Sequence, residues 1–318
     1  MKTRLTVLTL LAALSATFAG PARADDVSPE ALLTRYQPVT VLSQGELFAP
    51  TSVDDFLADA TLELRADDGS FQNAELPEPG LPVHGDGWRL DHRCPAIAGP
   101  VSTVGCYDPA SVGPSVVYGR YEVIGGATVL SYWLFYEHNF WSFPALPFGA
   151  VWQAHEGDWE VVHVVLDDKR TPVEAAYSQH CAGERRAWAN VQKMPGTSHP
   201  IVHVALGSHA NFFTPGVHPI ERACVPAPAL MFFDALGVAP FDVAVPGAVL
   251  GPGSTAIERV HDNEPRWLRF PGTWGEAQYV AAPPFGIPPT PFGASPVGPA
   301  FQDDWLDPLA TIAGYPLG

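Results

Sequence analysis

Proline and glycine constrain the fold of this 318-residue chain more than any other feature. The sequence contains 34 prolines and 29 glycines. Proline interrupts the helical hydrogen-bond ladder, and glycine weakens helix interiors. Long helices are therefore not expected. Helical spacing of apolar residues occurs only briefly, at residues 29–36 and 52–58. In the second segment Ser52 is suited to cap the helix, with Asp54 and Asp55 in its first turn.

Runs of β-branched and aromatic residues between turn-forming residues predict strands. These runs are residues 38–42, 115–124, 128–136, 160–166, 173–178, 201–206 and 266–269. Gly125 and Gly126 lie between two of them and predict a tight β-hairpin. The pattern predicts a mainly β protein, an antiparallel β-sandwich with long loops and few short helices.

The composition changes near residue 225. Residues 281–300 hold seven prolines, which cannot donate to a β ladder. They predict either an ordered coil that wraps the domain or a flexible segment. Four aromatic residues flank this stretch and favour packing against the domain: Trp267, Phe270, Trp274 and Trp305. We interpret residues 25–318 as one β-sandwich domain, with about 225–318 as its Pro/Gly-rich wrapping segment.

The first residues have the pattern of a secretory signal peptide. Lys2 and Arg4 precede an apolar run that ends near Phe18, and a small-x-small cleavage pattern ends at Ala24. We expect residues 1–24 to be removed by cleavage after Ala24, which predicts a secreted or periplasmic protein. No later stretch reaches 18 consecutive apolar residues, so no transmembrane span is expected.

The chain is strongly acidic. Its formal charge is −17, and removal of residues 1–24, which hold three basic residues and no acid, would bring it to −20. Such a charge repels phosphate backbones, so nucleic acid is not an expected partner. It is compatible with solubility and with the attraction of cations.

Four cysteines in an exported chain predict two disulfides out of three pairings. Short intervening loops favour Cys94–Cys106 and Cys181–Cys224. The sequence has no Cys-x-x-Cys pattern, so neither a zinc ribbon nor a thioredoxin-like centre is indicated.

The stretch His155-Glu156-Gly157-Asp158-Trp159-Glu160 places four ionisable side chains directly before a valine-rich run. If a strand begins at Glu160 and its alternation extends back, Asp158 and Glu160 share the face of Val162. His155 would arrive from the preceding turn, and Gly157 would allow a sharp bend.

Two carboxylates and one imidazole are ligands that suit a divalent cation. His155, Asp158 and Glu160 are therefore candidate metal ligands, with Ca²⁺ or Mg²⁺ favoured and Mn²⁺ or Zn²⁺ as alternatives. The other interpretation is a hydrogen-bonded polar cluster at a strand end. The zinc-protease pattern His-Glu-x-x-His is not met, because Trp159 occupies the position of the second histidine. No Gly-x-Ser-x-Gly elbow occurs either.

Two further polar turns follow predicted strands. His180, Glu184 and Arg185 follow the run 173–178 and are candidate ligand-binding residues, unless Glu184 and an arginine merely brace the loop. Asn211 is a fourth candidate, after the run 201–206. His209, in the same turn as Asn211, is a candidate general base, or an extra metal ligand, or a histidine that only holds the turn. If the protein is a hydrolase, either His209 or Glu156 would transfer the proton.

The segments 155–160, 177–188 and 202–213 together resemble the vacuolar-protein-sorting-62-like family. Residues 36–57 resemble its opening segment, and 270–275, 298–299 and Trp305 its closing one. This resemblance covers most of the predicted mature chain and implies no defined chemistry.

A more distant resemblance is to the necrosis-inducing-protein-like cytolysins, which carry a Gly-His-Arg-His-Asp-Trp-Glu heptapeptide. The first His, the Asp and the Glu of that heptapeptide align with His155, Asp158 and Glu160. Ala154 replaces the leading glycine, and Pro147 lies where those proteins have a further acidic ligand. The resemblance implies a β-sandwich and a cation site that engages a glycan or a lipid headgroup.

Three hypotheses follow from these patterns. The first is a secreted β-sandwich protein whose divalent-cation site binds a polar ligand such as a glycan or lipid headgroup. The second is a metal-assisted hydrolase of an ester, phosphoester or glycoside. In the third, the polar motifs are purely structural. The sequence does not decide whether the protein is an enzyme, and it predicts no oligomeric state.

Overall fold

The computed structural model describes residues 27–77, 80–92, 114–144, 150–225 and 227–318. The predicted signal peptide and the predicted Cys94–Cys106 disulfide lie outside these residues. The described part is mainly β, as the sequence predicted, with several sheets and few short helices. None of its helices has the length and apolar character needed to cross a membrane.

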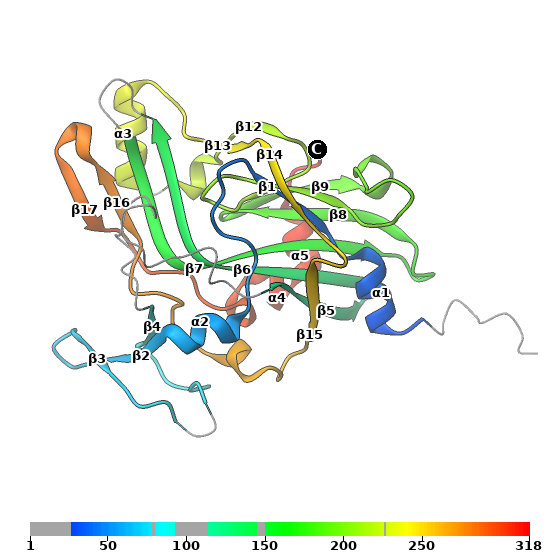
Figure 1. Ribbon diagram of the computed structural model, residues 1–318, viewed down its shortest axis with the longest axis horizontal. Helices are drawn as coiled ribbons and strands as arrows, with labels where there is room; N and C mark the ends of the chain where they lie inside the picture. The colour runs from blue at the N-terminus through cyan, green and yellow to red at the C-terminus, as the bar shows by residue number, and fades with distance from the viewer. Residues whose placement is uncertain (1–26, 78–79, 93–113, 145–149, 226) are drawn as a thin grey trace, which may run out of the picture.

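The largest sheet has eight strands, and a long hairpin lies at its centre (Figure 1). The strand order is β15-β5-β6-β7-β16-β17, and β8 pairs with β7 and β9. The bounds are β5 Ser115–Ile124, β6 Ala127–Pro144, β7 Ala150–Leu166, β8 Pro172–Gln179, β9 Ala182–Ala187, β15 Thr255–Val260, β16 Tyr279–Ala282 and β17 Ile287–Pro291. The predicted hairpin at Gly125 and Gly126 is confirmed: both have positive φ, as a two-residue turn between β5 and β6 requires.

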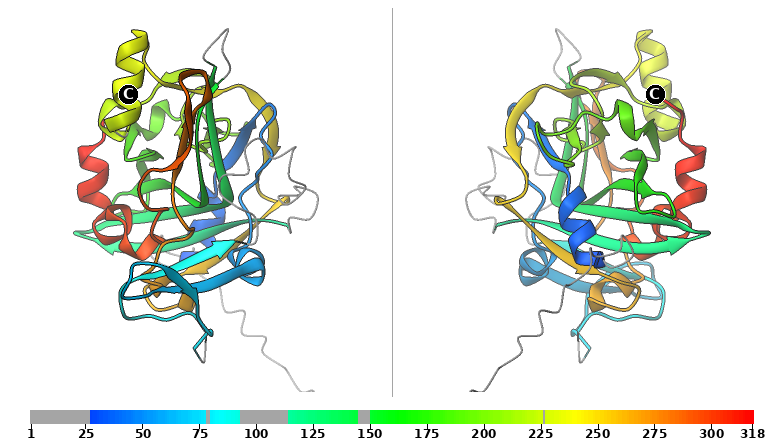
Figure 2. Two further views of the ribbon diagram at one scale, coloured as in Figure 1. Left: turned by 90° about the vertical axis from the view of Figure 1, so that its left-hand side faces the viewer. Right: turned by 90° about the vertical axis from the view of Figure 1, so that its right-hand side faces the viewer.

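A four-stranded sheet faces this hairpin (Figures 1 and 2), in the order β11-β10-β1-β14. Its strands are β1 Val39–Ser43, β10 Ile201–Val204, β11 Asn211–Phe212 and β14 Pro246–Leu250. Two smaller sheets are formed by β12 Gly216–Pro219 with β13 Phe241–Ala244, and by β2 Ala60–Arg65, β3 Phe71–Asn73 and β4 Trp88–His92. Pairing is antiparallel except at β1–β10 and β15–β5, which are parallel.

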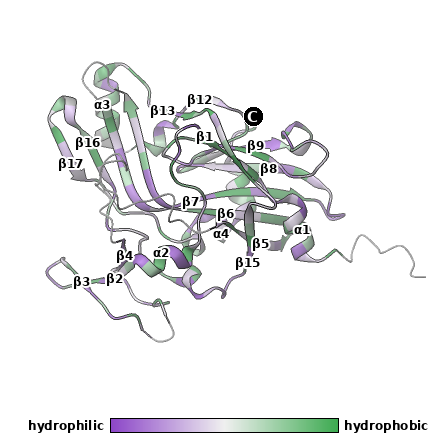
Figure 3. Cartoon of the chain, in the orientation of Figure 1, coloured by the Kyte–Doolittle hydropathy of each residue, from purple (hydrophilic) through white to green (hydrophobic). Residues whose placement is uncertain are grey.

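The β6–β7 hairpin is buried on both faces because its side chains alternate between two apolar clusters. Val162 and Val164 of β7 pack with Val202 and other residues of the four-stranded sheet. Val161 belongs to a second cluster, rich in aromatic rings, on the opposite face. Figure 3 shows the hydrophobic stretches along these central strands. The hairpin therefore forms the core on which the other elements are assembled.

The helices are short, as the proline and glycine content predicted. They are α1 Pro29–Tyr36, α2 Val53–Asp59, α3 Ala227–Leu236, α4 Asp303–Leu306 and α5 Pro308–Gly314, with 3₁₀ turns η3 Trp188–Asn190, η4 Arg222–Cys224, η5 Arg266–Arg269, η6 Pro283–Phe285 and η7 Pro299–Phe301. The Ser52 hydroxyl accepts hydrogen bonds from the amides of Asp54 and Asp55, which confirms the predicted cap. The strand predicted at 266–269 is wrong. Consecutive residues Trp267 and Leu268 are both buried there, which a half-buried strand does not allow.

The residues after 225 add strands to three of the sheets. Strand β13 pairs with β12, β14 with β1, β15 with β5, and β16 with β7. Much of the proline-rich stretch 281–300 is therefore neither coil nor flexible segment but part of a β-hairpin, β16–β17. Its prolines are tolerated because β17 lies at the edge of the sheet, where a missing donor leaves no partner unsatisfied.

Gly157 creates an irregularity in the middle of β7. Its φ is +59°, in the left-handed region, and a Cβ at this position would lie 2.1 Å from the carbonyl oxygen of Trp274. Only glycine satisfies both conditions. The expected bend at Gly157 is thus present. His155 does not arrive from a turn, however, because β7 already begins at Ala150.

We predict that Gly157→Ala destabilises the protein more than Gly196→Ala does. Both glycines have positive φ, but a Cβ at Gly196 meets no atom within 4 Å. Both changes incur about 1–2 kcal/mol for the left-handed backbone. Gly157→Ala adds about 1–3 kcal/mol for overpacking against Trp274. Urea unfolding measures both values, and equal losses would contradict this account.

Candidate functional site

The charged stretch of β7 lies in a gap of the sheet. Strand β16 pairs with β7 at residues 152–154, and β8 pairs with it at 162–166. Between them, residues 155–161 have no ladder partner on this edge among the described residues. A side chain replaces one of the missing ladder acceptors, since the Ser178 hydroxyl accepts a hydrogen bond from the amide of Val161 at 2.8 Å. The gap leaves room for a site.

A cavity of about 310 Å³ occupies this region, and polar side chains from distant segments line it. They include the three predicted metal ligands, which are His155, Asp158 and Glu160. The cavity is also lined by His180, Asn139, Ser208, Gln153, Gln278 and Gln302. A volume of this size is within the range of small-molecule sites. The structure therefore brings His155, Asp158 and Glu160 to one cavity, as the sequence predicted.

Gly157 determines which side chains face the cavity. In a regular strand His155 and Asp158 would point to opposite faces. The left-handed residue between them places both at the cavity and directs Glu156 to the other side of the strand. There Glu156 Oε2 accepts the amides of His92 at 3.2 Å and Glu276 at 3.4 Å. Burial raises the pKa of Glu156 to about 9, so its carboxyl group is neutral at pH 7.

His155 presents a neutral imidazole to the cavity. Burial lowers its pKa, although the nearby Asp158 carboxylate acts in the opposite direction. Its Nδ1 lies 3.2 Å from the carbonyl oxygen of Glu156 and can donate a hydrogen bond to it. Nε2 then remains as an acceptor, which is the form of histidine that binds metals or accepts from a hydroxyl.

Asp158 and Glu46 hold His209 between them. His209 Nδ1 lies 2.8 Å from Asp158 Oδ2, and its Nε2 lies 3.5 Å from Glu46 Oε1. Its ring stacks on Tyr136 with a centroid distance of 3.8 Å. The turn that delivers it contains two positive φ values, at Gly207 and at His209 itself. At Gly207 a Cβ would lie 2.0 Å from the carbonyl oxygen of Phe140, so the turn requires glycine there.

His209 is an imidazolium. Burial acts to lower its pKa, but the Glu46 and Asp158 carboxylates outweigh burial and raise the pKa to about 9. Burial acts to raise the pKa of Asp158, but the hydrogen bond from His209 and the positive charge of His209 act against burial, and the pKa is lowered. Glu46 is held ionised by His209 and by the amides of Gly207 and Phe48. Both ring nitrogens of His209 thus face carboxylates.

Glu160 lies deeper and is bound by Ser178, whose hydroxyl donates to Glu160 Oε2. Burial, followed by the neighbouring charge of Asp158, raises its pKa well above the ordinary value. Glu160 is therefore protonated unless a cation or a donor-rich ligand compensates its charge. Asp158 and Glu160 each use one carboxylate oxygen in these internal bonds, so the second oxygen of each is left for a ligand.

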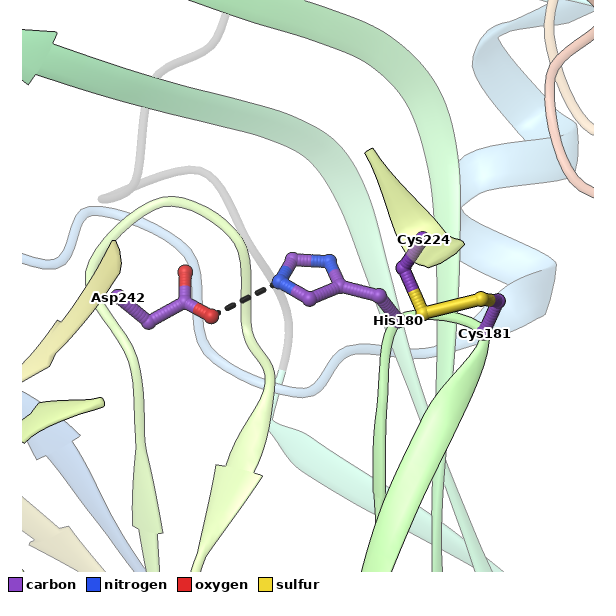
Figure 4. The surroundings of a disulfide bond; sticks show 4 residues. All are labelled: His180, Cys181, Cys224 and Asp242. Atoms are coloured by element: carbon purple, nitrogen blue, oxygen red, sulfur yellow. Dashed lines mark hydrogen bonds and ion pairs between the residues drawn. A yellow bond between two sulfur atoms is a disulfide. The ribbon is translucent and has the colours of Figure 1, made fainter. Parts of the chain in front are cut away.

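His180 forms a second polar chain at the cavity wall (Figure 4). Its Nε2 lies 2.8 Å from Asp242 Oδ2, and Asp242 Oδ1 accepts from the Ser208 hydroxyl at 2.7 Å. The adjacent Cys181 is bonded to Cys224, which confirms the predicted pairing. Burial acts to lower the pKa of His180, but Asp242 and then Glu160 and Asp158 outweigh it and raise the pKa to about 9.

The other predicted ligand-binding residues do not join this cavity. Glu184 pairs with Arg186 at 2.8 Å on β9. Arg185 donates to the carbonyl oxygen of Tyr315 and to Glu174. Both act within the β8–β9 edge, as the loop-bracing interpretation describes. Asn211 is fully buried on β11, and its side-chain amide has no hydrogen-bond partner among the described residues.

Several functional residues were not found from the sequence. Glu46 stands in a loop with no recognisable motif, and the three glutamines come from three separate segments. Asp242 had a usable signal, because it is the one acid within the apolar strand Phe241–Ala244 and is 1% exposed. An ionisable residue inside such a run requires a buried partner.

The described residues contain no group of three or more His, Cys, Asp or Glu side chains arranged to hold a metal ion. A cation in the cavity would therefore have at most two protein side chains of these kinds as ligands in the present arrangement. Asp158 and Glu160, each with an unused carboxylate oxygen, fit that role for a hard cation whose remaining positions are taken by water or ligand oxygens.

Comparison with known proteins adds little to these observations. No family model matches the chain, so the resemblance to the vacuolar-protein-sorting-62-like family receives no support. No curated protein matches it either.

The solved structures that match include proteins described as having a toxin fold, a necrosis- and ethylene-inducing protein and a non-toxic HaNLP3 protein, in agreement with the more distant of the two resemblances. One is described as a toxin fold for microbial attack and plant defense. Its sequence is 17% identical, the match covers 61% of this chain and 77% of that chain, and the TM-score is 0.33. NLPPya in complex with glucosamine has 18% identity, coverages of 61% and 68%, and a TM-score of 0.32. Necrosis and Ethylene inducing Protein 2 from the causal agent of cocoa's Witches Broom disease has 15% identity, coverages of 74% and 79%, and a TM-score of 0.32. Likenesses of this degree carry no conclusion about ligand or activity.

We predict that the His180–Asp242 pair stabilises the protein in a pH-dependent way. Because the folded pKa of about 9 exceeds the unfolded value near 6.5, the contribution is complete below pH 6.5. It is lost as the pH rises to about 9. Asp242→Asn should cost on the order of 1–3 kcal/mol at pH 6 and much less at pH 9.5. Urea unfolding at both pH values measures this, and a pH-independent loss would contradict it.

Proposed function

We propose that the cavity beside β7 binds a small hydroxyl-rich ligand, such as a sugar or the sugar headgroup of a lipid. The observation that carries the proposal is the composition of the cavity wall. Carboxylate, imidazole and amide side chains from separate segments converge on one volume of about 310 Å³. Hydroxyl groups both donate and accept hydrogen bonds, and a wall of this composition supplies both kinds of partner.

The acidic character of the wall favours ligands that bring donors or positive charge. Asp158 and Glu160 each retain one carboxylate oxygen outside their internal hydrogen bonds, and His155 retains a ring nitrogen that accepts. A neutral sugar meets these acceptors with hydroxyl groups, and an amino sugar meets them with an ammonium group. The wall is less suited to a phosphate, which would lie against two carboxyl groups.

We also propose that a divalent cation binds at the same two carboxyl groups. Burial, and after it the neighbouring carboxylate of Asp158, raises the pKa of Glu160, and a bound cation would offset both effects. Asp158 and Glu160 would hold it, with His155 nearby and oxygen atoms of water or ligand in its remaining positions. In such an arrangement the cation strengthens the attraction of the site for sugar oxygens.

A hydrolytic role is less well supported by the geometry. His209 is fully buried, and both its ring nitrogens face carboxylates rather than the cavity. Glu156 lies on the other face of β7. A general base must reach the proton that it removes, and neither candidate is so placed.

We further propose that the protein acts outside the cytoplasm. The Cys181–Cys224 disulfide is of a kind that forms and persists in oxidising compartments, and the predicted signal peptide agrees with this. Export would also place the acidic cavity where extracellular sugars and millimolar Ca²⁺ are available.

We predict that Ca²⁺ or Mg²⁺ binds weakly and that Glu160→Gln removes most of this binding. The amide keeps the shape of Glu160 but loses the charge that a cation requires. Isothermal titration calorimetry should show at least a tenfold loss of affinity, whereas Asp168→Asn, at an exposed carboxylate outside the cavity, should bind as wild type does. Proton release on binding is expected in wild type and Asp168→Asn but not in Glu160→Gln, since the protonated Glu160 carboxyl becomes a ligand.

We predict that glucosamine and other amino sugars bind more tightly than their neutral counterparts in the absence of metal. Asp158→Asn should reduce this preference by about tenfold, since a charge-assisted bond contributes roughly 1.5–3 kcal/mol. Titration of glucosamine and glucose into wild type, Asp158→Asn and Asp168→Asn provides the measurement. Equal binding by all three proteins would contradict the proposed site, and thermal unfolding of each verifies that it is folded.

A further inference from the structure

The polar cavity does not end at its polar wall. It shares Gln153, His180 and Cys224 with a narrow passage of about 30 Å³, whose other walls include Trp141, Val151 and Phe233. This passage in turn shares Val151, Ala229 and Val280 with a groove of about 200 Å³. Because neighbouring spaces share lining residues, the three lie next to one another in a row from β7 toward α3 and the β16–β17 hairpin.

The character of the path changes along its length. The cavity is lined by carboxyl, imidazole and amide groups, whereas the groove is lined almost wholly by aliphatic and aromatic side chains, with Thr290 as its one polar residue among the described ones. Figure 1 shows α3 and the β16–β17 hairpin near the same ends of β6 and β7. Residues of β7, α3, β16 and β17 line the groove. A path of this kind matches a molecule with one polar and one apolar end.

On the basis of the proposed function, we propose that the ligand is amphipathic. Its polar headgroup occupies the cavity, and one unbranched aliphatic chain runs through the passage into the groove. The passage has about the volume of a single water molecule. A space this small suits one methylene chain better than a ring or two chains. Val280 and Ala229 line both passage and groove and would contact the chain where it turns between them.

The shared walls favour a chain attached to the headgroup over a separate protein partner. A protein side chain inserted into the groove from outside would not use the passage, whose lining residues are shared with both the polar cavity and the groove. The Cys181–Cys224 disulfide holds the passage in place, because Cys224 precedes α3 and Cys181 follows His180 at the cavity wall (Figure 4). Headgroup recognition and chain burial would thus be mechanically linked.

The test uses n-alkyl β-glucosides from methyl to octyl below their micelle concentrations, together with 1-octanol, titrated into the full protein. Each buried methylene should increase affinity by up to about fourfold. Ile287→Asp places a charge in the groove and should abolish most of this increase. Val249→Asp, at a valine 62% exposed on β14, is the matched control and should leave it unchanged.

Ala229→Trp provides a second variant that narrows the path without adding charge, and it should also remove the chain-length dependence. The proposal would be overturned if the affinity of wild type did not rise with chain length. It would also be overturned if the affinity of Ile287→Asp and Ala229→Trp rose with chain length as much as that of wild type. Failure of the headgroup site alone gives a different result. Methyl glucoside would then not bind to wild type, whereas 1-octanol would still bind to wild type and would not bind to Ile287→Asp.

Discussion

The site depends on one buried interaction, the contact of the His209 imidazolium with Asp158 and Glu46. Glu46 follows β1 and His209 follows β10, both in the four-stranded sheet, whereas Asp158 belongs to β7 of the large sheet. The ion pairs therefore join the two sheets at the end of the sandwich where the cavity opens. Removing one partner from such a cluster leaves an uncompensated buried charge, which typically costs about 3–5 kcal/mol. This cluster therefore stabilises the packing of the two sheets and also fixes the position of Asp158 in the site.

The second constraint is the interruption of the ladder on the edge of β7. An unpaired strand edge exposes backbone groups that attract other chains unless something covers them. Here the Ser178 hydroxyl takes the amide of Val161, and the segment that contains Gln302 lies over the cavity. The gap concentrates polar groups at a place where the surrounding side chains are apolar. Such a combination is typical of ligand sites, in which a few polar groups orient a molecule and apolar walls exclude water.

The internal charges of the cavity explain why a ligand or cation is expected there. Asp158 is neutralised by His209, but Glu160 has only the Ser178 hydroxyl and is therefore protonated. His180, held by Asp242, adds a positive group to the cavity wall. The site thus combines hydrogen-bond donors with acceptors. This combination is suited to sugars, whose hydroxyl groups act as both.

How much the sequence predicts differs between the fold and the site. The proline and glycine content, the β-branched runs and the Gly125-Gly126 turn predicted a mainly β fold with α1, α2 and most central strands near their observed places. The period-two pattern correctly placed Asp158 and Glu160 on one face, because side-chain alternation is a local property of the strand. The cysteine spacing predicted the Cys181–Cys224 bond. The error at Arg266–Arg269 arose because burial of adjacent residues, which only the tertiary structure reveals, favoured a 3₁₀ turn.

The sequence alone therefore determined the mainly β character, the candidate acids at 155–160 and the turn that carries His209. Tertiary structure decided which of these groups meet. It brought Glu46 and Asp242 to histidines far away in the chain, directed Glu156 away from the cavity through the left-handed Gly157, and kept Arg185 at the edge of β9. It also placed an apolar groove near the polar cavity. Contacts of this kind depend on long-range packing, and local spacing carries no record of them.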